Sequence, residues 1–163
     1  MKTLNRFIKE SLQCKAIYNE SLLDDEDELT IKSPIEIIKS FIDDNYNVTG
    51  KLDIKESNNI YIVNCRSLVE VKNKEIFQLT NGFFKWGVVK GNFSCSYCTL
   101  LKDLTGAPEK VGRSFYCSHC TSLTSLQGAP KKVDGDFGCN DCKIKFTEDD
   151  VKKVSKVKGK IIV

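Results

Sequence analysis

Three Cys-x-x-Cys pairs recur in this chain at an interval of 22 residues, and this repeat constrains the fold more than any other feature of the sequence. The pairs are Cys95/Cys98, Cys117/Cys120 and Cys139/Cys142. The surrounding positions recur as well: Phe93, Phe115 and Phe137 coincide, as do Leu101 with Leu123, Leu104 with Leu126, and Gly-Ala-Pro at 106–108 with 128–130. Apolar, turn and cysteine positions that return together indicate one supersecondary unit stacked on itself. The sequence therefore predicts a solenoid.

A second pattern, Val-x-Gly-x-apolar-x-apolar, predicts a strand in each repeat, because alternate residues of a strand point to the same side. It occurs at residues 48–54, 89–95, 133–139 and 157–163, and at 111–117 with the glycine one place earlier. In this alignment Ile54 and Val163 take the place of the first cysteine. Residues 55–88 are degenerate, although residues 60–63 fit a strand and Cys65 to Leu68 matches Cys120 to Leu123.

Helices are predicted at both ends of the repeats. Ser33-Pro34-Ile35-Glu36 has the N-cap, the proline and the capping-box glutamate that begin a helix, which we expect to end within residues 44–47. Its inward residues would be Ile35, Ile38, Phe41 and Ile42. A second helix is expected from Thr147, with Val151 and Val154 packing back. An amphipathic helix at residues 3–13 and an acidic linker to about residue 32 complete the N-terminal part.

These patterns divide the chain into a helical N-terminal segment with an acidic linker, residues 1–47, and a repeat solenoid, residues 48–163. The solenoid would comprise irregular rungs at 48–88, regular rungs at 89–146 and a C-terminal cap at 147–163. We expect a mainly β fold with an α-helical N-terminal cap and parallel strands in rungs of about 22 residues.

The run from Phe115 through Cys117, Cys120 and Leu123 to Leu126 resembles the leucine-rich repeat, whose pattern ends in a Cys or Asn ladder. One departure is that leucine stands three places after the second cysteine, and only Ile144 stands at the usual two. The chain is also similar to repeat proteins of bacteria and their phages that carry L-x-S-L-x-G-A-P-x-x-V-x-G-x-F-x-C. The resemblance covers residues 89–146 well and 48–88 loosely. It implies a short leucine-rich-repeat-like solenoid that serves as a binding scaffold.

The first ten residues carry a separate resemblance. Met1-Lys2-Thr3 followed by Phe7-Ile8-Lys9-Glu10 is similar to the capsid-targeting peptides of T-even phage internal proteins. That similarity implies cleavage after Glu10 and association with a virion. The alternative is a short amphipathic helix that docks on the solenoid or on a partner.

The cysteines have two interpretations. As structural thiols, the first of each pair would point inward from a strand and the second would lie at the bend, where a small apolar group with a weak donor fits. As a zinc module, structural or nucleic-acid-binding, the spacing C-x2-C-x18-C-x2-C fits ribbon sites, with ligands Cys95, Cys98, Cys117, Cys120, Cys139 and Cys142. The apolar residues at two first-cysteine positions and the periodic flanks favour structural thiols, so we expect no metal and no cofactor.

Composition argues against most other functions. His119 is the single histidine and lies where other repeats have Tyr97 and Asp141, so we expect no catalytic residues and no enzyme. The chain has a net charge of +3 and lacks the apolar run of about 18 residues that spans a membrane. Lysines 152, 153, 156, 158 and 160 lack interleaved aromatics, which argues against nucleic acid as a partner. Without a signal-peptide pattern, we expect a protein of the reducing bacterial cytoplasm, or of a virion if the phage resemblance holds.

We therefore predict a non-catalytic protein–protein interaction module whose partner is an unknown protein. Its binding face would be formed by outward strand residues, with Tyr116 as the one large anchor. These residues are Asn92, Ser94, Ser96, Ser114, Tyr116, Ser118, Asp136, Gly138 and Asn140. The alternatives are the zinc module and a phage internal or host-directed protein on the same scaffold.

Overall fold

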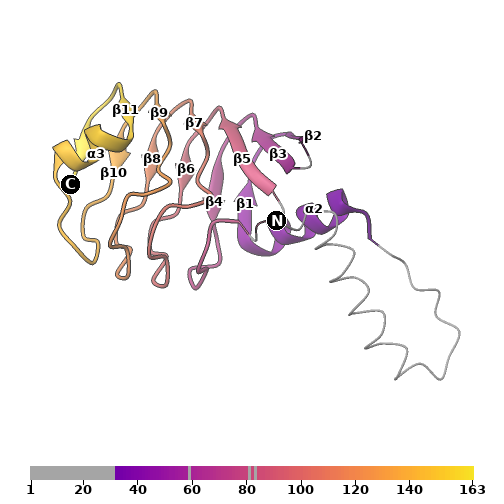
Figure 1. Cartoon of the computed structure of the whole chain (residues 1–163), viewed down its shortest axis with the longest axis horizontal. Helices are drawn as coiled ribbons and strands as arrows, with labels where there is room; N and C mark the ends of the chain where they lie inside the picture. The colour runs from indigo at the N-terminus through magenta and orange to yellow at the C-terminus, as the bar shows by residue number, and fades with distance from the viewer. Residues whose placement is uncertain (1–31, 59, 81, 83) are drawn as a thin grey trace, which may run out of the picture.

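A computed structural model describes residues 32–58, 60–80, 82 and 84–163 of the chain. Short strands stack as a β-solenoid that runs from helix α2 (Pro34–Asn45) at one end to helix α3 (Glu148–Val154) at the other (Figure 1). The helix expected at residues 3–13 and the acidic linker lie outside the described residues. The predicted mainly β solenoid with an N-terminal helix is confirmed.

Each rung contributes to two six-stranded sheets. Sheet A has the order β1 (Tyr46–Val48), β4 (Val69–Val71), β6 (Phe93–Ser94), β8 (Phe115–Tyr116), β10 (Phe137–Gly138) and β12 (Ile161–Ile162). Sheet B has the order β2 (Leu52–Ser57), β3 (Ile60–Cys65), β5 (Phe84–Val89), β7 (Lys110–Val111), β9 (Lys132–Val133) and β11 (Lys156–Val157). Neighbouring strands are parallel, except that β1 and β2 run antiparallel to β4 and β3.

The Val-x-Gly-x-Phe-x-Cys pattern, predicted as one strand, forms two strands in different sheets. In the middle rung, β7 belongs to sheet B, β8 belongs to sheet A, and Gly112 lies at the corner between them. A Cβ atom at Gly112 would lie 2.4 Å from the carbonyl oxygen of Lys90 in the preceding rung. Gly112 thus leaves room for the backbone beneath it, one place before Arg113, which stands at the corner position that Gly91 and Gly135 occupy in the neighbouring rungs.

The strand register corrects the alignment of the irregular rungs. Cys65 pairs with Val89 and Val69 pairs with Phe93, so Cys65 lies in the valine column and not in the second-cysteine column. Ile54 is also misaligned in the prediction, because it pairs with Val63 in an antiparallel strand of sheet B. Val71, two residues after Val69, occupies the first-cysteine position of this rung.

The C-terminal rung follows the predicted alignment. Phe137 pairs with Ile161 and Gly138 with Ile162, and the N–H of Cys139 donates to the carbonyl oxygen of Ile162 (2.9 Å). Val163 therefore continues the position of Cys139. Strand pairs in the regular rungs are 22 residues apart, whereas those on either side, such as Val69/Phe93 and Phe137/Ile161, are 24 apart.

A column of phenylalanines forms the centre of the core. Phe93, Phe115 and Phe137 are fully buried, and their ring centroids are 5.8 and 5.0 Å apart. Trp86 and Tyr46 pack edge-on at the N-terminal end of the column. Aromatic pairs contribute about 0.5–1.5 kcal/mol of stability beyond the burial of their surface, so the column stabilises the stacking of the rungs.

Both described helices begin where predicted. Ser33 and Glu36 form the capping box of α2, and Thr147 and Asp150 form that of α3. Their buried residues include Ile38, Ile42 and Val151, whereas Ile35 and Val154 are exposed, contrary to prediction. No helix in the described part of the chain is long and apolar enough to cross a membrane.

Candidate binding face on sheet A

Tyr116 lies at the centre of the predicted face. Ser94, Tyr116 and Gly138 are partners in register across β6, β8 and β10. A Cβ atom at Gly138 would lie 2.9 Å from Cδ1 of Tyr116, so the tyrosine ring extends over Gly138. The absence of a side chain at Gly138 gives the half-buried ring its place on the sheet.

Three other predicted face residues join the rungs to one another. The N–H of Ser114 donates to Oδ1 of Asn92 (3.0 Å), and the N–H of Asp136 donates to Oγ of Ser114 (3.0 Å). The N–H of Lys160 continues the series by donating to Oδ1 of Asp136 (2.7 Å). These polar side chains satisfy backbone donors of the next rung, which is a structural role.

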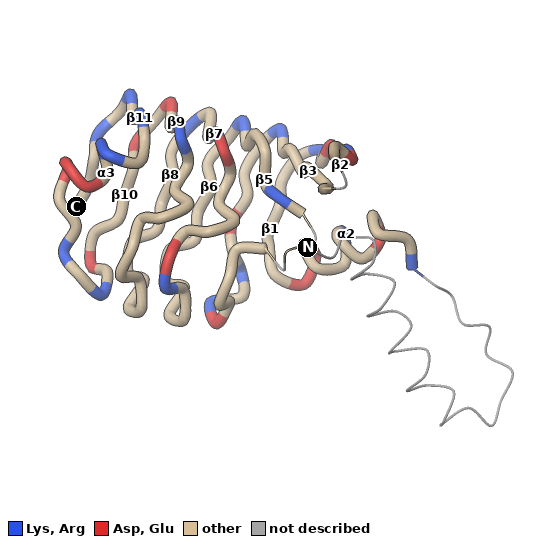
Figure 2. The backbone as a smooth tube through the Cα atoms, in the orientation of Figure 1, with Lys and Arg blue, Asp and Glu red and all other residues tan. Residues whose placement is uncertain are grey.

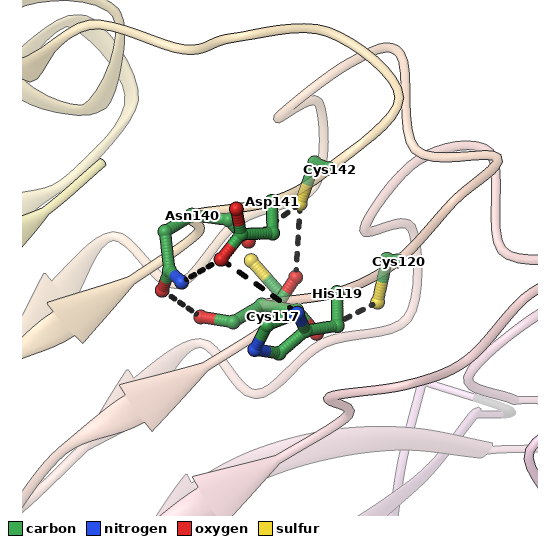
Figure 3. A network of polar contacts seen from close by, with 7 residues as sticks. Cys117, His119, Cys120, Asn140, Asp141 and Cys142 are labelled. Carbon is green, nitrogen blue, oxygen red and sulfur yellow. Dashed lines mark hydrogen bonds and ion pairs between the residues drawn. The ribbon is translucent and has the colours of Figure 1, made fainter.

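Ser118 and Asn140 form a further contact between rungs. Ser118, predicted to face outward, is only 9% exposed, and its hydroxyl donates to Oδ1 of Asn140 (2.6 Å; Figure 3). Ser118 lies on the same side of the sheet as Tyr116, because its Oγ would be 3.3 Å from a Cβ atom at Gly138, but its neighbours cover it and leave little of it to a partner. Three residues of the predicted face, Ser94, Ser96 and Tyr116, have side chains that make no hydrogen bond within the described residues.

Next to this face lies a column that the sequence analysis did not assign to binding. Tyr97, His119 and Asp141 occupy equivalent turn positions, and all three are in the left-handed region, with φ of 64°, 58° and 56°. The Tyr97 ring stacks on the His119 ring at a centroid distance of 4.6 Å and 12° between planes. His119 Nδ1 lies 3.7 Å from Oδ2 of Asp141 (Figure 3). The sequence offered one signal for this column. The position before the second cysteine of each pair carries a residue other than glycine in all three repeats.

Tyr97 is the residue of this column least suited to a positive φ, because aspartate and histidine are enriched there and tyrosine is not. Its side chain is 58% exposed, and a left-handed conformation costs a residue with a Cβ roughly 1–2 kcal/mol. Tyr97 directly follows Ser96, and His119 is three residues from Tyr116, which places their backbones at most about 10 Å apart. We call Tyr97, Tyr116 and His119 the aromatic face.

The cysteines of the repeats form two columns that run from rung to rung. Those of the first column, Cys95, Cys117 and Cys139, are buried at the end of the sheet A strands. The second cysteines lie at the bend, where Cys120 Sγ donates to the carbonyl oxygen of Cys95 (3.1 Å) and Cys142 Sγ to that of Cys117 (3.2 Å; Figure 3). All seven cysteines in the described residues are free thiols.

Burial keeps most of these thiols protonated. It raises the pKa of Cys98 to about 11 and that of Cys120 to about 12, and it raises the pKa of Cys95 well above its ordinary value. The neighbouring Cys117 thiol lowers the pKa of Cys139. Zinc requires thiolate ligands. In the described ranges, no three His, Cys, Asp or Glu side chains are placed to hold a metal ion.

Comparison of the chain with family models, with curated proteins and with solved structures found no match. The resemblance to leucine-rich repeats and to phage repeat proteins therefore stays a prediction. The assignment of a function depends on the geometry of the chain's own residues.

Proposed function

We propose that this protein is a non-catalytic protein-interaction module whose aromatic face, Tyr97, Tyr116 and His119, contacts the partner. The observation that carries the proposal is the exposed Tyr97, held at φ 64° and stacked on His119. Glycine would adopt that backbone without strain. Strained surface residues cluster where they have a function.

The chemistry of the face suits protein recognition. Tyrosine is enriched among the residues that dominate binding energy, because it combines a large apolar area with a polar end. The stacking of Tyr97 on His119 and the seat of Tyr116 over Gly138 order these rings before a partner arrives. Preordered side chains lose less conformational entropy on binding, so more of the contact energy contributes to affinity.

The same geometry favours binding over catalysis. A cysteine nucleophile needs a thiolate beside a base. Burial raises the pKa of Cys120, and its Sγ donates to the Cys95 carbonyl. The His119 ring faces Tyr97 and Asp141. The proposal includes a leucine-rich-repeat-like scaffold, a bacterial or phage origin and a cytoplasmic location. A virion protein is the alternative.

Affinity capture from bacterial lysate, followed by titration of the recovered protein, tests the proposal. Tyr116→Ala and Tyr97→Ala should each weaken binding about tenfold or more, the effect expected of an interface anchor. Phe77→Ala is the matched control, because Phe77 is an aromatic residue that is 69% exposed outside the aromatic face. Cys117→Val should fold and bind. The proposal fails if both tyrosine variants bind like the wild type, or if Phe77→Ala causes the larger loss.

A further inference from the structure

Strand β2 forms one edge of sheet B. Within the described residues it is the last strand of that sheet, and Figure 1 shows it at the N-terminal end of the solenoid. Its six residues all pair with β3, so the other side of β2 has no strand beside it in this part of the chain. The unpaired N–H and C=O groups of such an edge are a template for pairing with another chain.

The hydrogen bonds of the β2–β3 hairpin determine which backbone groups face the free edge. The N–H of Arg66 donates to the carbonyl oxygen of Lys51 (3.3 Å), so residue 51 directs its carbonyl toward the partner strand. The carbonyl oxygen of Cys65 points the other way and accepts from the N–H of Lys90 (2.9 Å). These directions alternate along an antiparallel pair. The backbone groups of residues 52, 54 and 56 therefore face the free edge.

The β2 strand of a second copy can pair with this edge in an antiparallel direction. Residues that exchange hydrogen bonds must both direct their backbone groups across the new contact, so residues 52, 54 and 56 pair among themselves. A two-fold axis at Ile54 pairs Ile54 with itself and Leu52 with Glu56. This register uses all three residues and gives the two strands their greatest overlap.

The charges of β2 favour the same register. With the axis at Ile54, Asp53 of each copy lies opposite Lys55 of the other, in a non-hydrogen-bonded pair with Cα atoms about 4.5 Å apart. An axis at residue 53 or 55 would oppose two aspartates or two lysines, which destabilises a sheet. Both side chains are available, because Lys55 is 70% and Asp53 47% exposed. Figure 2 shows acidic and basic positions together at this end of sheet B.

Helix α2 lies on the inner side of sheet B. Phe41 of this helix packs edge-on against the buried Phe84 of β5, with ring centroids 5.9 Å apart. A two-fold axis normal to the sheet keeps the helices of both copies on that side. Leu52 and Ile54 are only partly buried against the core of their own chain, so a second strand beside them would remove more apolar surface from water.

We propose that two copies of this chain associate through antiparallel pairing of their β2 strands about a two-fold axis at Ile54. Sheet B then continues from one copy into the other, and the contact closes the free edge of both. Tyr116 belongs to β8 of sheet A, so the dimer contact and the aromatic face use different parts of the chain. Two short strands make a small interface, which is typical of weak, reversible complexes.

Sedimentation velocity of the full chain at low salt tests the proposal, over concentrations from about 1 µM to 1 mM that cover weak complexes. The wild type should shift from the monomer to the dimer and no further, because a two-fold contact is closed. Asp53→Lys and Lys55→Asp each place two pairs of like charges across the axis. Each variant should therefore associate at least about tenfold more weakly.

Restoring opposite charges should restore the dimer. The double variant Asp53→Lys/Lys55→Asp again places an acid opposite a base in the same register, so it should associate like the wild type. An equimolar mixture of the two single variants should form heterodimers for the same reason. Glu109→Lys is the matched control, because it reverses a charge beside Lys131 (3.1 Å) before β7 and should leave association unchanged. Far-UV circular dichroism checks that each variant is folded.

Carbodiimide cross-linking tests the contact without any substitution, because it joins carboxylates to amines that touch. In a mixture of isotopically labelled and unlabelled wild-type chains, peptides of mixed isotope content should join Asp53 to Lys55. A wild type that stays monomeric at about 1 mM would overturn the proposal. So would a folded double variant that does not regain association, an equal loss in Glu109→Lys, or mixed-isotope links that exclude Asp53 and Lys55.

Discussion

The thiol of Cys120 lies 3.1 Å from the carbonyl oxygen of Cys95, 25 residues earlier in the chain. Cys142 and Cys117 repeat the contact at 3.2 Å in the next rung. In the second and third pairs, the second cysteine therefore donates to the backbone of the first cysteine in the rung before it. A buried carbonyl without a donor is costly. The cysteine thiol supplies the donor for this carbonyl at a bend where little space is available.

Replacing Cys120 with valine should reveal the strength of this contact. Cys120→Val keeps a small apolar side chain but removes the donor, so we expect the free energy of unfolding to fall by about 1–3 kcal/mol. Cys98→Val is the control, because Cys98 Sγ is 3.9 Å from its acceptor, Ser96, in the same rung. That variant should lose less than about 1.5 kcal/mol. Denaturant unfolding measures both, and equal losses would contradict a role for the thiol as a donor.

The phenylalanine column predicts a second set of stabilities. Phe115 packs between Phe93 and Phe137, so Phe115→Ala should reduce the free energy of unfolding by about 3–5 kcal/mol. Phe137→Ala should lose a similar amount, because Phe137 also lies between two rungs. A loss under about 1 kcal/mol for Phe115→Ala, measured by denaturant unfolding, would mean that the rungs do not stack in this register.

The regular rungs were predictable because large and small residues recur together at one interval. The rung from Cys65 to Val71 was expected but aligned in the wrong register, because Ser67 replaces the corner glycine and Val69 replaces the phenylalanine. Only the apolar character of the inward side chains is preserved there, and that signal is weak over a few residues. The switch between sheets at the glycine was also missed, since alternation alone does not distinguish one strand from two strands joined by a corner.

The candidate site was predictable in part. Alternation correctly assigned Tyr116 to the outside, but it could not distinguish solvated polar residues from those that bond to the next rung, such as Asn92 and Ser114. Tyr97 was noted only as a variable residue between the two cysteines of a pair. Its left-handed backbone and its stacking on His119 depend on the register of neighbouring rungs, which requires coordinates.

The backbone strain at Tyr97 predicts an order of stability for two small substitutions. Tyr97→Gly relieves the positive φ, whereas Tyr97→Ala keeps a Cβ in the left-handed region. We expect the glycine variant to be more stable than the alanine variant by about 1 kcal/mol, although both lose the stacking on His119. Thermal melts of the two variants check this order. If alanine is the more stable, the left-handed turn is not a source of strain.

Thiol burial predicts a loss of stability at alkaline pH. The pKa values of Cys98 and Cys120 are raised to about 11 and 12, so the folded state holds protons that the unfolded state releases above about pH 9. The stabilising contribution of these thiols is complete below that pH and is lost as the pH rises toward 11–12. Denaturant unfolding at pH 8, 9 and 10 should show a falling free energy. The decline should be shallower in Cys120→Val, and identical slopes would argue against thiol burial as the cause.

The central claim is that the cysteines hold the rungs together as thiols, in a scaffold whose binding surface is aromatic. Elemental analysis of the purified, reduced protein, combined with thermal melts with and without a strong chelator, tests it most directly. The account predicts far less than one zinc per chain and the same melting temperature with chelator, because no metal-binding energy is linked to folding. Stoichiometric zinc together with unfolding by the chelator would contradict it.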